Sequence, residues 1–285
     1  MFLSEAKGMD ILMNETFRTL HDINYKANSY LYHYSSFEKA TKIIFYNNLR
    51  FSNIYNLNDT TEYKPKIVFS TDNKDIEKIY ERCQDINRHI KICCFTQDNG
   101  KIKRFKKQNN MYFTDYTGRG FAFPRMWAQY ATNNKGICFI LNKALLEKEI
   151  SDRFEIIEAG AITYVERYKC FRFTSKAISN FNNQVLSRST IDSIVATKFF
   201  SEYPDYIKEN YFTKLLDWRD ENEYRIALFS PDGENLTINN LNHFLEGIIV
   251  GENIDETDEA INKKLLKRRV PIRKIVFQNR CITLK

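Results

Sequence analysis

The stretch Leu31-Tyr-His-Tyr-Ser-Ser-Phe-Glu38 joins two predicted elements at a single turn of chain. Its residues predict a short strand over 31–34 that holds His33 on one face. Ser35 and Glu38 have the spacing of a capping box, so we expect a helix to begin directly after the strand. The stretch therefore predicts a strand–helix junction with a histidine beside a helix N-terminus.

A second informative stretch, Trp218-Arg-Asp-Glu-Asn-Glu-Tyr-Arg-Ile-Ala-Leu228, lies far downstream. It predicts a charged turn followed by a strand that begins at Glu223, with Arg225 on the same face. Two interpretations are open. Glu223 and Arg225 lie on a wet strand face, or Glu223 points into a cleft. In a cleft, its carboxylate would hydrogen-bond a ribose hydroxyl or stabilise an oxocarbenium-like centre.

The composition is that of a globular protein with a substantial core. The chain has 285 residues, of which 43% are hydrophobic and 28% charged. No apolar run approaches the roughly 18 residues that span a bilayer, and the N-terminal residues do not resemble a signal peptide. We therefore expect a cytoplasmic protein without a membrane partner.

The six cysteines show no CxxC spacing and do not cluster with the four histidines, so we expect reduced core cysteines and no metal site. The net charge of +7 is concentrated in two basic runs, 101–107 and 263–269, with Arg273 and Lys274 after the second. These runs either form a solvated surface or attract the phosphates of a nucleotide or nucleic acid.

Helices and short strands alternate without a regular βαβ rhythm, which favours an α+β fold. We predict a helical lead-in over residues 1–28 and a single globular α+β domain over 29–285, with a central mixed or split β-sheet and flanking helices. The longest irregular loop is expected between residues 96 and 124. Strands are predicted near 31–34, 49–52, 90–95, 136–141, 161–165, 223–229, 247–250, 274–277 and 281–284, and helices near 73–88, 125–131, 142–150, 176–217 and 255–267.

His33 has a structural and a functional interpretation. A lone histidine on a strand is commonly a structural residue whose ring is hydrogen-bonded within the protein. However, the next predicted strand ends at Ser52, and the loop after it carries Asn58 and Asp59. Together with the helix N-terminus, these groups would suit a ribose or a phosphate. Trp127 and Tyr130 lie three residues apart on a predicted helix and form either core or the wall of a site. A GxSxG elbow and a P-loop are both absent.

At these residues the chain resembles the bacterial family known as domain of unknown function 2971. The resemblance rests on the order and spacing of short motifs between about residues 30 and 250. These are the stretch 31–36, Leu49–Ser52, Asn58-Asp59 with Glu62, Cys94–Thr96, Met126-Trp127 with Tyr130-Ala131, Lys135–Cys138, and Trp218 with Glu221 and Glu223–Ile226. The family name itself implies no activity.

The chain also resembles, more distantly, the ADP-ribosyltransferases. This resemblance implies NAD as the substrate, with His33 holding a ribose beside Tyr34, Ser52 or Tyr55 near the nicotinamide, and Glu223 driving transfer. Asn58 and Asp59 would support a loop over the dinucleotide, and Trp127 or Tyr130 would form an aromatic wall. Tyr34 stands where the poly-ADP-ribose polymerases have a glycine, and the second motif lacks an aromatic-glycine signature.

Three functional hypotheses follow. The first is an NAD-dependent ADP-ribosyltransferase-like enzyme, a bacterial toxin or anti-phage defence effector that modifies nucleic acid or protein. The second is a non-enzymatic nucleotide or nucleic-acid binding module of a defence system. The third is a structural partner protein in a defence operon. The first hypothesis, with the roles given above, requires His33 and Glu223 to line one cleft.

Overall fold

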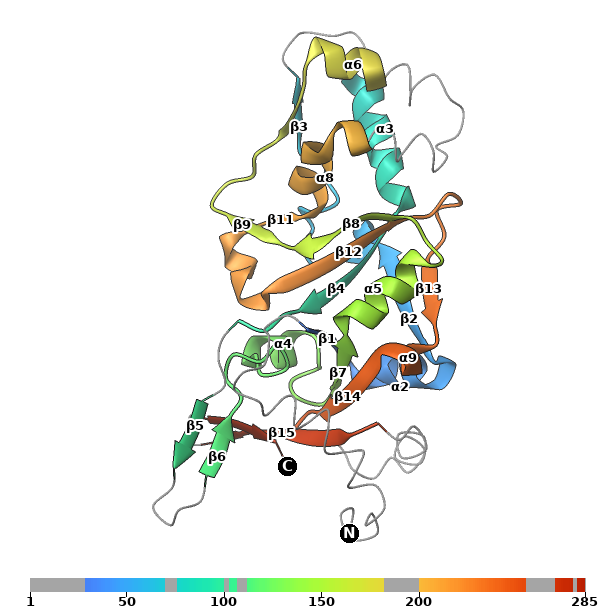
Figure 1. The fold of residues 1–285 in the computed structure, drawn as a ribbon. Coiled ribbons are helices and arrows are strands. Elements are labelled where there is room, and N and C mark those ends of the chain that lie inside the picture. The colour runs from blue at the N-terminus through green and yellow to red at the C-terminus, as the bar shows by residue number, and fades with distance from the viewer. Residues whose placement is uncertain are drawn as a thin grey trace.

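The computed structural model describes residues 29–69, 76–99, 103–106, 112–181, 200–254, 270–278 and 281–284. The predicted lead-in over 1–28 and the predicted helix over 255–267 lie outside these residues. The described part is an α+β structure built on a central mixed sheet with helices packed against it (Figure 1). The predicted fold class is therefore confirmed. None of the described helices is long and apolar enough to cross a membrane.

The strands that form the sheets come from the whole length of the described chain. They are β1 (Tyr30–Ser35), β2 (Asn48–Asn53), β3 (Ile67–Phe69), β4 (Ile90–Thr96), β5 (Lys103–Lys106), β6 (Tyr112–Asp115), β7 (Ile137–Asn142), β8 (Ile156–Ala161), β9 (Thr163–Val165), β10 (Phe171–Phe173), β11 (Thr213–Leu215), β12 (Glu223–Phe229), β13 (Leu236–Asn239), β14 (Leu245–Val250), β15 (Ile272–Gln278) and β16 (Cys281–Leu284).

The helices lie between these strands and are mostly short. They are α2 (Phe37–Tyr46), α3 (Ile76–His89), α4 (Pro124–Gln129), α5 (Lys143–Ser151), α6 (Ser175–Phe181), α8 (Pro204–Tyr211) and α9 (Leu241–Phe244), with 3-10 turns η1 (Ile54–Asn56) and η3 (Leu216–Glu221).

Strand β4 is the branch point of the ten-stranded main sheet. One edge of β4 pairs along its whole length with β12, from Thr96 opposite Glu223 to Ile90 opposite Phe229. The other edge is shared, because β2 pairs with it at Ile92 and β1 pairs with it at Thr96. Most pairs in the main sheet are antiparallel, and β14 with β15 is parallel. The sheet is therefore mixed and divides at β4.

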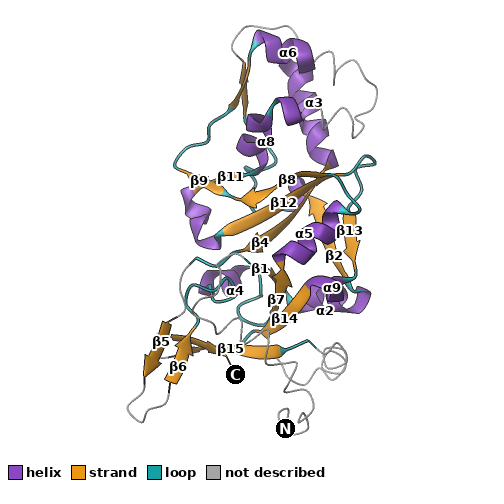
Figure 2. Ribbon diagram, in the orientation of Figure 1, coloured by secondary structure: helices purple, strands orange, loops and turns teal. Residues whose placement is uncertain are grey.

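Three apolar cores pack against the sheet. The first lies under α3, α6 and α8 and receives Ile92 and Phe229 from β4 and β12. The second lies under α2, α5 and α9, which Figure 2 shows gathered beside β2, β7 and β14, and receives Phe95 and Ile226. The third is rich in aromatic residues and surrounds α4 and β1. Because side chains alternate along a strand, β4 and β12 contribute to both the first and the second core.

Two local predictions need correction. The N-cap of α2 is Ser36, whose Oγ accepts a hydrogen bond from the Lys39 amide at 3.4 Å, whereas Ser35 is the last residue of β1. Glu38 instead pairs with Lys42 at 2.7 Å. The N-cap was therefore predicted one residue too early, and the capping box was wrong, because the residue three positions after Ser36 is Lys39. The predicted loop over 96–124 also contains the β5–β6 ribbon. Strands β3, β8, β10, β11 and β13 were not predicted either.

Candidate functional site

Glu223 is positioned by the residue before it. Asn222 has a left-handed backbone with φ 42°, which ends η3 and turns the chain into β12. Its side-chain amide donates to the Gln97 carbonyl at 2.9 Å, and its own carbonyl accepts from the Gln97 amide at 2.9 Å. Asparagine tolerates this conformation better than most residues. The start of β12 is thereby tied to the chain that leaves β4.

Glu223 belongs to a buried group of five charged residues, which we call the carboxylate cluster. Its members are Glu62, Lys214, Glu221, Glu223 and Arg225, and each is at most 5% exposed. Lys214 Nζ contacts Glu62 Oε1 at 3.1 Å, and Glu221 Oε2 and Glu223 Oε2 at 2.8 Å each. Arg225 contacts Glu62 Oε2 through Nη1 at 2.8 Å and Glu223 Oε1 through Nε at 2.7 Å.

The cluster is assembled from four segments of the chain. Glu62 follows η1, Lys214 lies on β11, Glu221 ends η3, and the other two members lie on β12. Three carboxylates face two cations, so the formal charge of the cluster is −1. An excess negative charge in a water-poor setting attracts a positive charge more strongly than it would in water.

Glu223, Lys214 and Arg225 stabilise one another in their charged forms. Burial alone raises the pKa of Glu223, but the charges of Arg225 and Lys214 outweigh it and lower that pKa to about 2. Burial lowers the pKa of Lys214, yet its attraction to Glu223 and Glu62 raises the pKa overall. Glu223 is therefore a carboxylate at neutral pH, and Lys214 is an ammonium.

Aromatic and amide side chains surround the cluster. The Tyr130 hydroxyl donates to Glu221 Oε1 at 2.6 Å, and it also interacts with Asn58. The Tyr164 hydroxyl accepts from the Glu223 backbone amide at 2.9 Å. The half-buried Trp218 ring lies over Lys214, with Nζ 4.9 Å from the ring centroid. These rings place flat apolar surfaces beside the charged groups of the cluster.

Two buried polar atoms near Glu223 have no hydrogen-bond partner among the described residues. They are Thr96 Oγ1 and Arg225 Nη2. Thr96 lies directly opposite Glu223 in the pairing of β4 with β12, so their side chains share a face of the sheet.

Lys66 connects Asp59 with the cluster, because its charge interacts with both Asp59 and Glu62. Asp59 accepts hydrogen bonds from the Thr61 amide at 2.8 Å and from the Tyr168 hydroxyl at 3.4 Å. Lys66 Nζ lies 4.5 Å from the centroid of the Tyr168 ring. Burial lowers the pKa of Lys66 to about 8, although its attraction to Glu62 opposes this. Asn58, Asp59 and Tyr130 therefore lie around the cluster that contains Glu223.

His33 does not join them. Tyr32 is directly opposite Thr96, which is directly opposite Glu223, so these three side chains share one face of the sheet. His33 follows Tyr32 and points to the other face. There its Nδ1 pairs with the Cys94 carbonyl at 3.1 Å, its ring lies 5.8 Å from that of Phe95, and burial lowers its pKa. His33 and Glu223 do not line one cleft.

Tyr34 and Trp127 lie in the third core. Their rings meet edge to face at 5.3 Å. The Tyr34 hydroxyl donates to the Gly120 carbonyl and the Trp127 indole to the Phe121 carbonyl, each at 2.7 Å. Trp127 has no exposed surface. Their polar atoms and rings are occupied by protein, so this placement does not support a role as the wall of a ligand site.

Ser52 and Tyr55 lie toward α3. Ser52 is half-buried and pairs with Ile92 on β4. The Tyr55 hydroxyl donates to the Gln84 carbonyl of α3 at 3.1 Å, and its ring lies 5.4 Å from that of Tyr63. Both residues lie on the side of α3, so this placement does not distinguish either of them as the second-motif residue.

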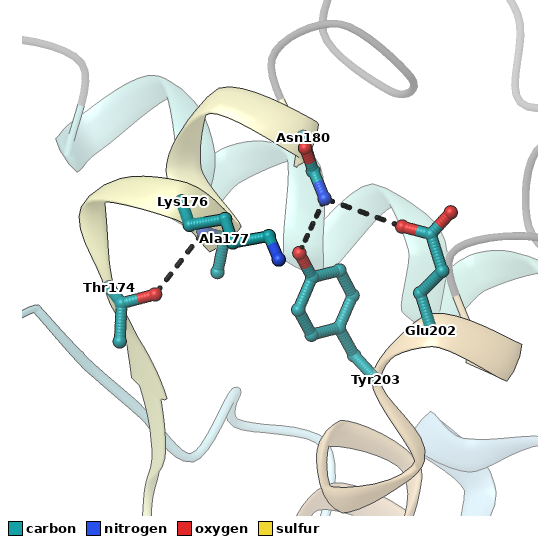
Figure 3. A pocket seen from close by; sticks show the side chains of 6 residues that line it. All are labelled: Thr174, Lys176, Ala177, Asn180, Glu202 and Tyr203. Atoms are coloured by element: carbon teal, nitrogen blue, oxygen red, sulfur yellow. Dashed lines mark hydrogen bonds between the residues drawn. The ribbon is translucent and has the colours of Figure 1, made fainter.

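A cavity of about 420 Å³ lies elsewhere, at α6 (Figure 3). The Asn180 amide donates to the Tyr203 hydroxyl at 2.8 Å and faces Glu202 at 3.4 Å. The described residues that line it are Thr174, Lys176, Ala177, Asn180, Glu202 and Tyr203. None of them belongs to the carboxylate cluster.

Comparison with known proteins places the cluster within a family match. Residues 126–226 match the model of the family described as "Protein of unknown function (DUF2971)". The match supports the family resemblance noted from the sequence, and the matched range contains all the cluster residues except Glu62. A search of curated proteins found no match. A search of solved structures found none either.

Sequence reasoning named Glu223 but not its partners as a group. Glu62 was interpreted only as a polar group of the loop that carries Asn58 and Asp59, and Glu221 only as a carboxylate next to Glu223. Lys214 was placed in a mostly helical region, yet it lies on β11, which pairs with β9. An isolated lysine between Thr213 and Leu215 carries no local signal for a buried ion, so neither composition nor periodicity could have found it.

Proposed function

We propose that the chain cleaves the nicotinamide–ribose bond of NAD at the carboxylate cluster, as an ADP-ribosyltransferase-like enzyme. The observation that carries the proposal is the net negative charge of a buried cluster that has Glu223 at its centre. The resemblance to the ADP-ribosyltransferases also gives Glu223 the decisive role, but the role that it gives His33 is not supported, because His33 faces the other side of the sheet.

The chemistry needs a negative group beside a developing positive one. When the bond between the ribose C1′ carbon and the pyridinium nitrogen breaks, its electron pair leaves with neutral nicotinamide. The ribose then carries the positive charge until water or an acceptor nucleophile adds at C1′ and loses a proton. A fixed carboxylate in a low-dielectric site stabilises that charge without reorganising.

The other members of the cluster would hold Glu223 in place. Arg225 and Lys214 each contact one of its carboxylate oxygens, which fixes the orientation of the group. The half-buried Tyr130 and Trp218 rings supply surfaces for a base, and Asn58 supplies an amide at the same side. In this version of the mechanism His33 organises the sheet and does not contact the dinucleotide.

The test is nicotinamide release from NAD, measured without an acceptor and with single-stranded DNA, RNA or protein. Glu223→Gln keeps the shape of the side chain and removes its charge. We expect it to lower the rate by about 10²–10³-fold, the usual effect of losing one stabilising group at the reacting centre. Glu158→Gln is the matched control, because Glu158 is exposed on the neighbouring strand β8 and should leave the rate unchanged.

Thermal unfolding of both variants checks that each remains folded. Equal background release by the wild type and Glu223→Gln, under every acceptor condition, would defeat the enzymatic proposal. If NAD then still raised the unfolding temperature, the chain would be a nucleotide-binding module without turnover. NAD cleavage of this kind would suit a toxin or an anti-phage effector, which depletion of NAD in expressing cells would test.

A further inference from the structure

The cavity at α6 lies between two parts of the chain (Figure 3). One wall is the first part of α6 with Thr174 before it, and the other is the pair Glu202-Tyr203 that leads into α8. Its volume of about 420 Å³ lies within the range of roughly 300–1,000 Å³ that is usual for small-molecule sites. The cavity is therefore large enough for a small metabolite.

The α6 wall presents a cation and an amide on one side of the helix. Lys176 and Asn180 are four residues apart, so they share a face of α6. Ala177 lines the cavity next to them, and its methyl group takes up little of the space. Thr174 Oγ1 accepts a hydrogen bond from the Ala177 amide at 3.2 Å, which fixes the first turn of the helix. The helix thus holds both polar side chains beside the cavity.

The opposite wall is held by ring packing and by Asn180. The Tyr203 ring lies edge to face with that of Phe171 on β10, with the centroids 5.8 Å apart. The Tyr203 hydroxyl accepts from Asn180 Nδ2 at 2.8 Å, and the same nitrogen lies 3.4 Å from Glu202 Oε2 (Figure 3). A carboxylate only accepts hydrogen bonds, so the amide nitrogen is the atom that faces Glu202. These contacts fix a ring and a carboxylate on this wall.

The described residues that line the cavity carry one charge of each sign. Lys176 makes no ion pair with any residue that the structure describes, so its ammonium is open to a negative group. Glu202 would repel a simple anion, and Lys176 would repel a simple cation. A molecule with both charges suits both walls, and the Tyr203 ring offers an apolar surface to its uncharged part. Charge and volume together favour a free amino acid.

We propose that the cavity between α6 and Tyr203 binds a free amino acid. Lys176 holds its carboxylate, Glu202 holds its ammonium, and its side chain lies against the Tyr203 ring. None of the described residues that line the cavity belongs to the carboxylate cluster, and the binding requires no NAD. The proposal therefore stands or falls independently of NAD cleavage.

Thermal unfolding in the presence of each standard L-amino acid selects the best ligand, because a ligand of the folded state raises the unfolding temperature. Isothermal titration calorimetry then compares this amino acid with two derivatives. Its amide lacks the negative charge, and its N-acetyl form lacks the positive charge. We expect each derivative to bind about fivefold or more weakly than the free amino acid, because each loses one ion pair.

Lys176→Met removes the partner of the ligand carboxylate. Lys148→Met is the matched control, because Lys148 is exposed on α5 and both variants lower the net charge from +7 to +6. We expect Lys176→Met to bind the free amino acid about fivefold or more weakly and to bind the amide no more weakly than the wild type does. Lys176→Arg keeps the charge and should retain most of the affinity, and Lys148→Met should bind as the wild type does.

Glu202→Gln provides the reciprocal test. It should weaken binding of the free amino acid and should not weaken binding of the N-acetyl form any further. Circular dichroism confirms that the variants are folded. The proposal is overturned if no amino acid stabilises the protein, if both derivatives bind as tightly as the free amino acid, or if Lys176→Met and Lys148→Met bind it alike.

Discussion

Lys214 shows how a single residue can hold the members of a site together. Its ammonium contacts three carboxylates that come from three different elements. The desolvation of two cations and three carboxylates is costly, and their mutual attraction offsets that cost only while every partner is present. A network of this kind is weak evidence for stability and better evidence that the position of its charges matters, which is why the functional proposal is centred on it.

Lys66 makes a prediction at the same scale. Its ammonium donates to the Asn210 carbonyl at 3.2 Å and is buried near Glu62, Asp59 and Arg225, and its pKa is lowered to about 8. A folded pKa below the unfolded value near 10.4 means that the unfolded chain binds more protons between these two values. This residue's contribution to stability therefore rises as the pH increases from about 8 to about 10.4.

Lys66→Met should remove that rise. We expect the free energy of unfolding of the wild type, relative to Lys66→Met, to increase by about 1–3 kcal/mol between roughly pH 7 and pH 10. Urea unfolding at several pH values measures it, and taking the difference cancels the titration of the tyrosines. Lys42→Met, at an exposed position, should show no such change. A difference that stays flat across this range would contradict the prediction.

At the scale of elements, Asn222 decides where β12 begins. Its left-handed backbone and its amide bond to Gln97 place Glu223 at the first position of the strand. Asn222→Ala should lower the free energy of unfolding by about 1–3 kcal/mol, because it combines a strained left-handed backbone with a lost hydrogen bond. Asn222→Gly adopts the left-handed backbone without strain, so it should lower the free energy of unfolding by less. Urea unfolding compares the two, and an equal loss in both would refute the role of backbone strain.

The order of elements could be predicted largely from the sequence, because it depends on local patterns. The apolar run of β12 and the helical spacing in α2 were both predicted correctly. The N-cap was predicted one residue too early, because two serines in succession can each serve as the N-cap. The ribbon over 103–115 was missed, because a dense run of basic residues masks a strand pattern.

The candidate functional site was harder to predict from local sequence patterns. Alternation fixes the faces within one strand, so the orientation of His33 relative to Tyr32 could be foreseen. Its orientation relative to Glu223 depends on which residue of β4 each strand meets. Tyr32 and Glu223 both meet Thr96, a fact of register between segments about 190 residues apart. Local sequence carries no information on that register.

At the scale of the whole molecule, β4 and β12 join the cores. On one face they contribute Ile92 and Phe229 to the first core, and on the other Phe95 and Ile226 to the second. If the first core opened alone, these strands would lose their cover on one face while the helices of the second core still held the other. Sheet hydrogen bonds along β4 would then face water. The two cores should therefore unfold together.

We accordingly expect one cooperative transition, although the cores lie on different sides of the sheet. Phe173→Ala in the first core and Phe139→Ala in the second each remove a buried ring, at a cost of about 3–5 kcal/mol. Each should lower the midpoint of the same single transition. Calorimetry, with near- and far-ultraviolet circular dichroism as independent probes, measures this. Two resolved transitions, each sensitive to one variant alone, would instead divide the chain into separate folding units.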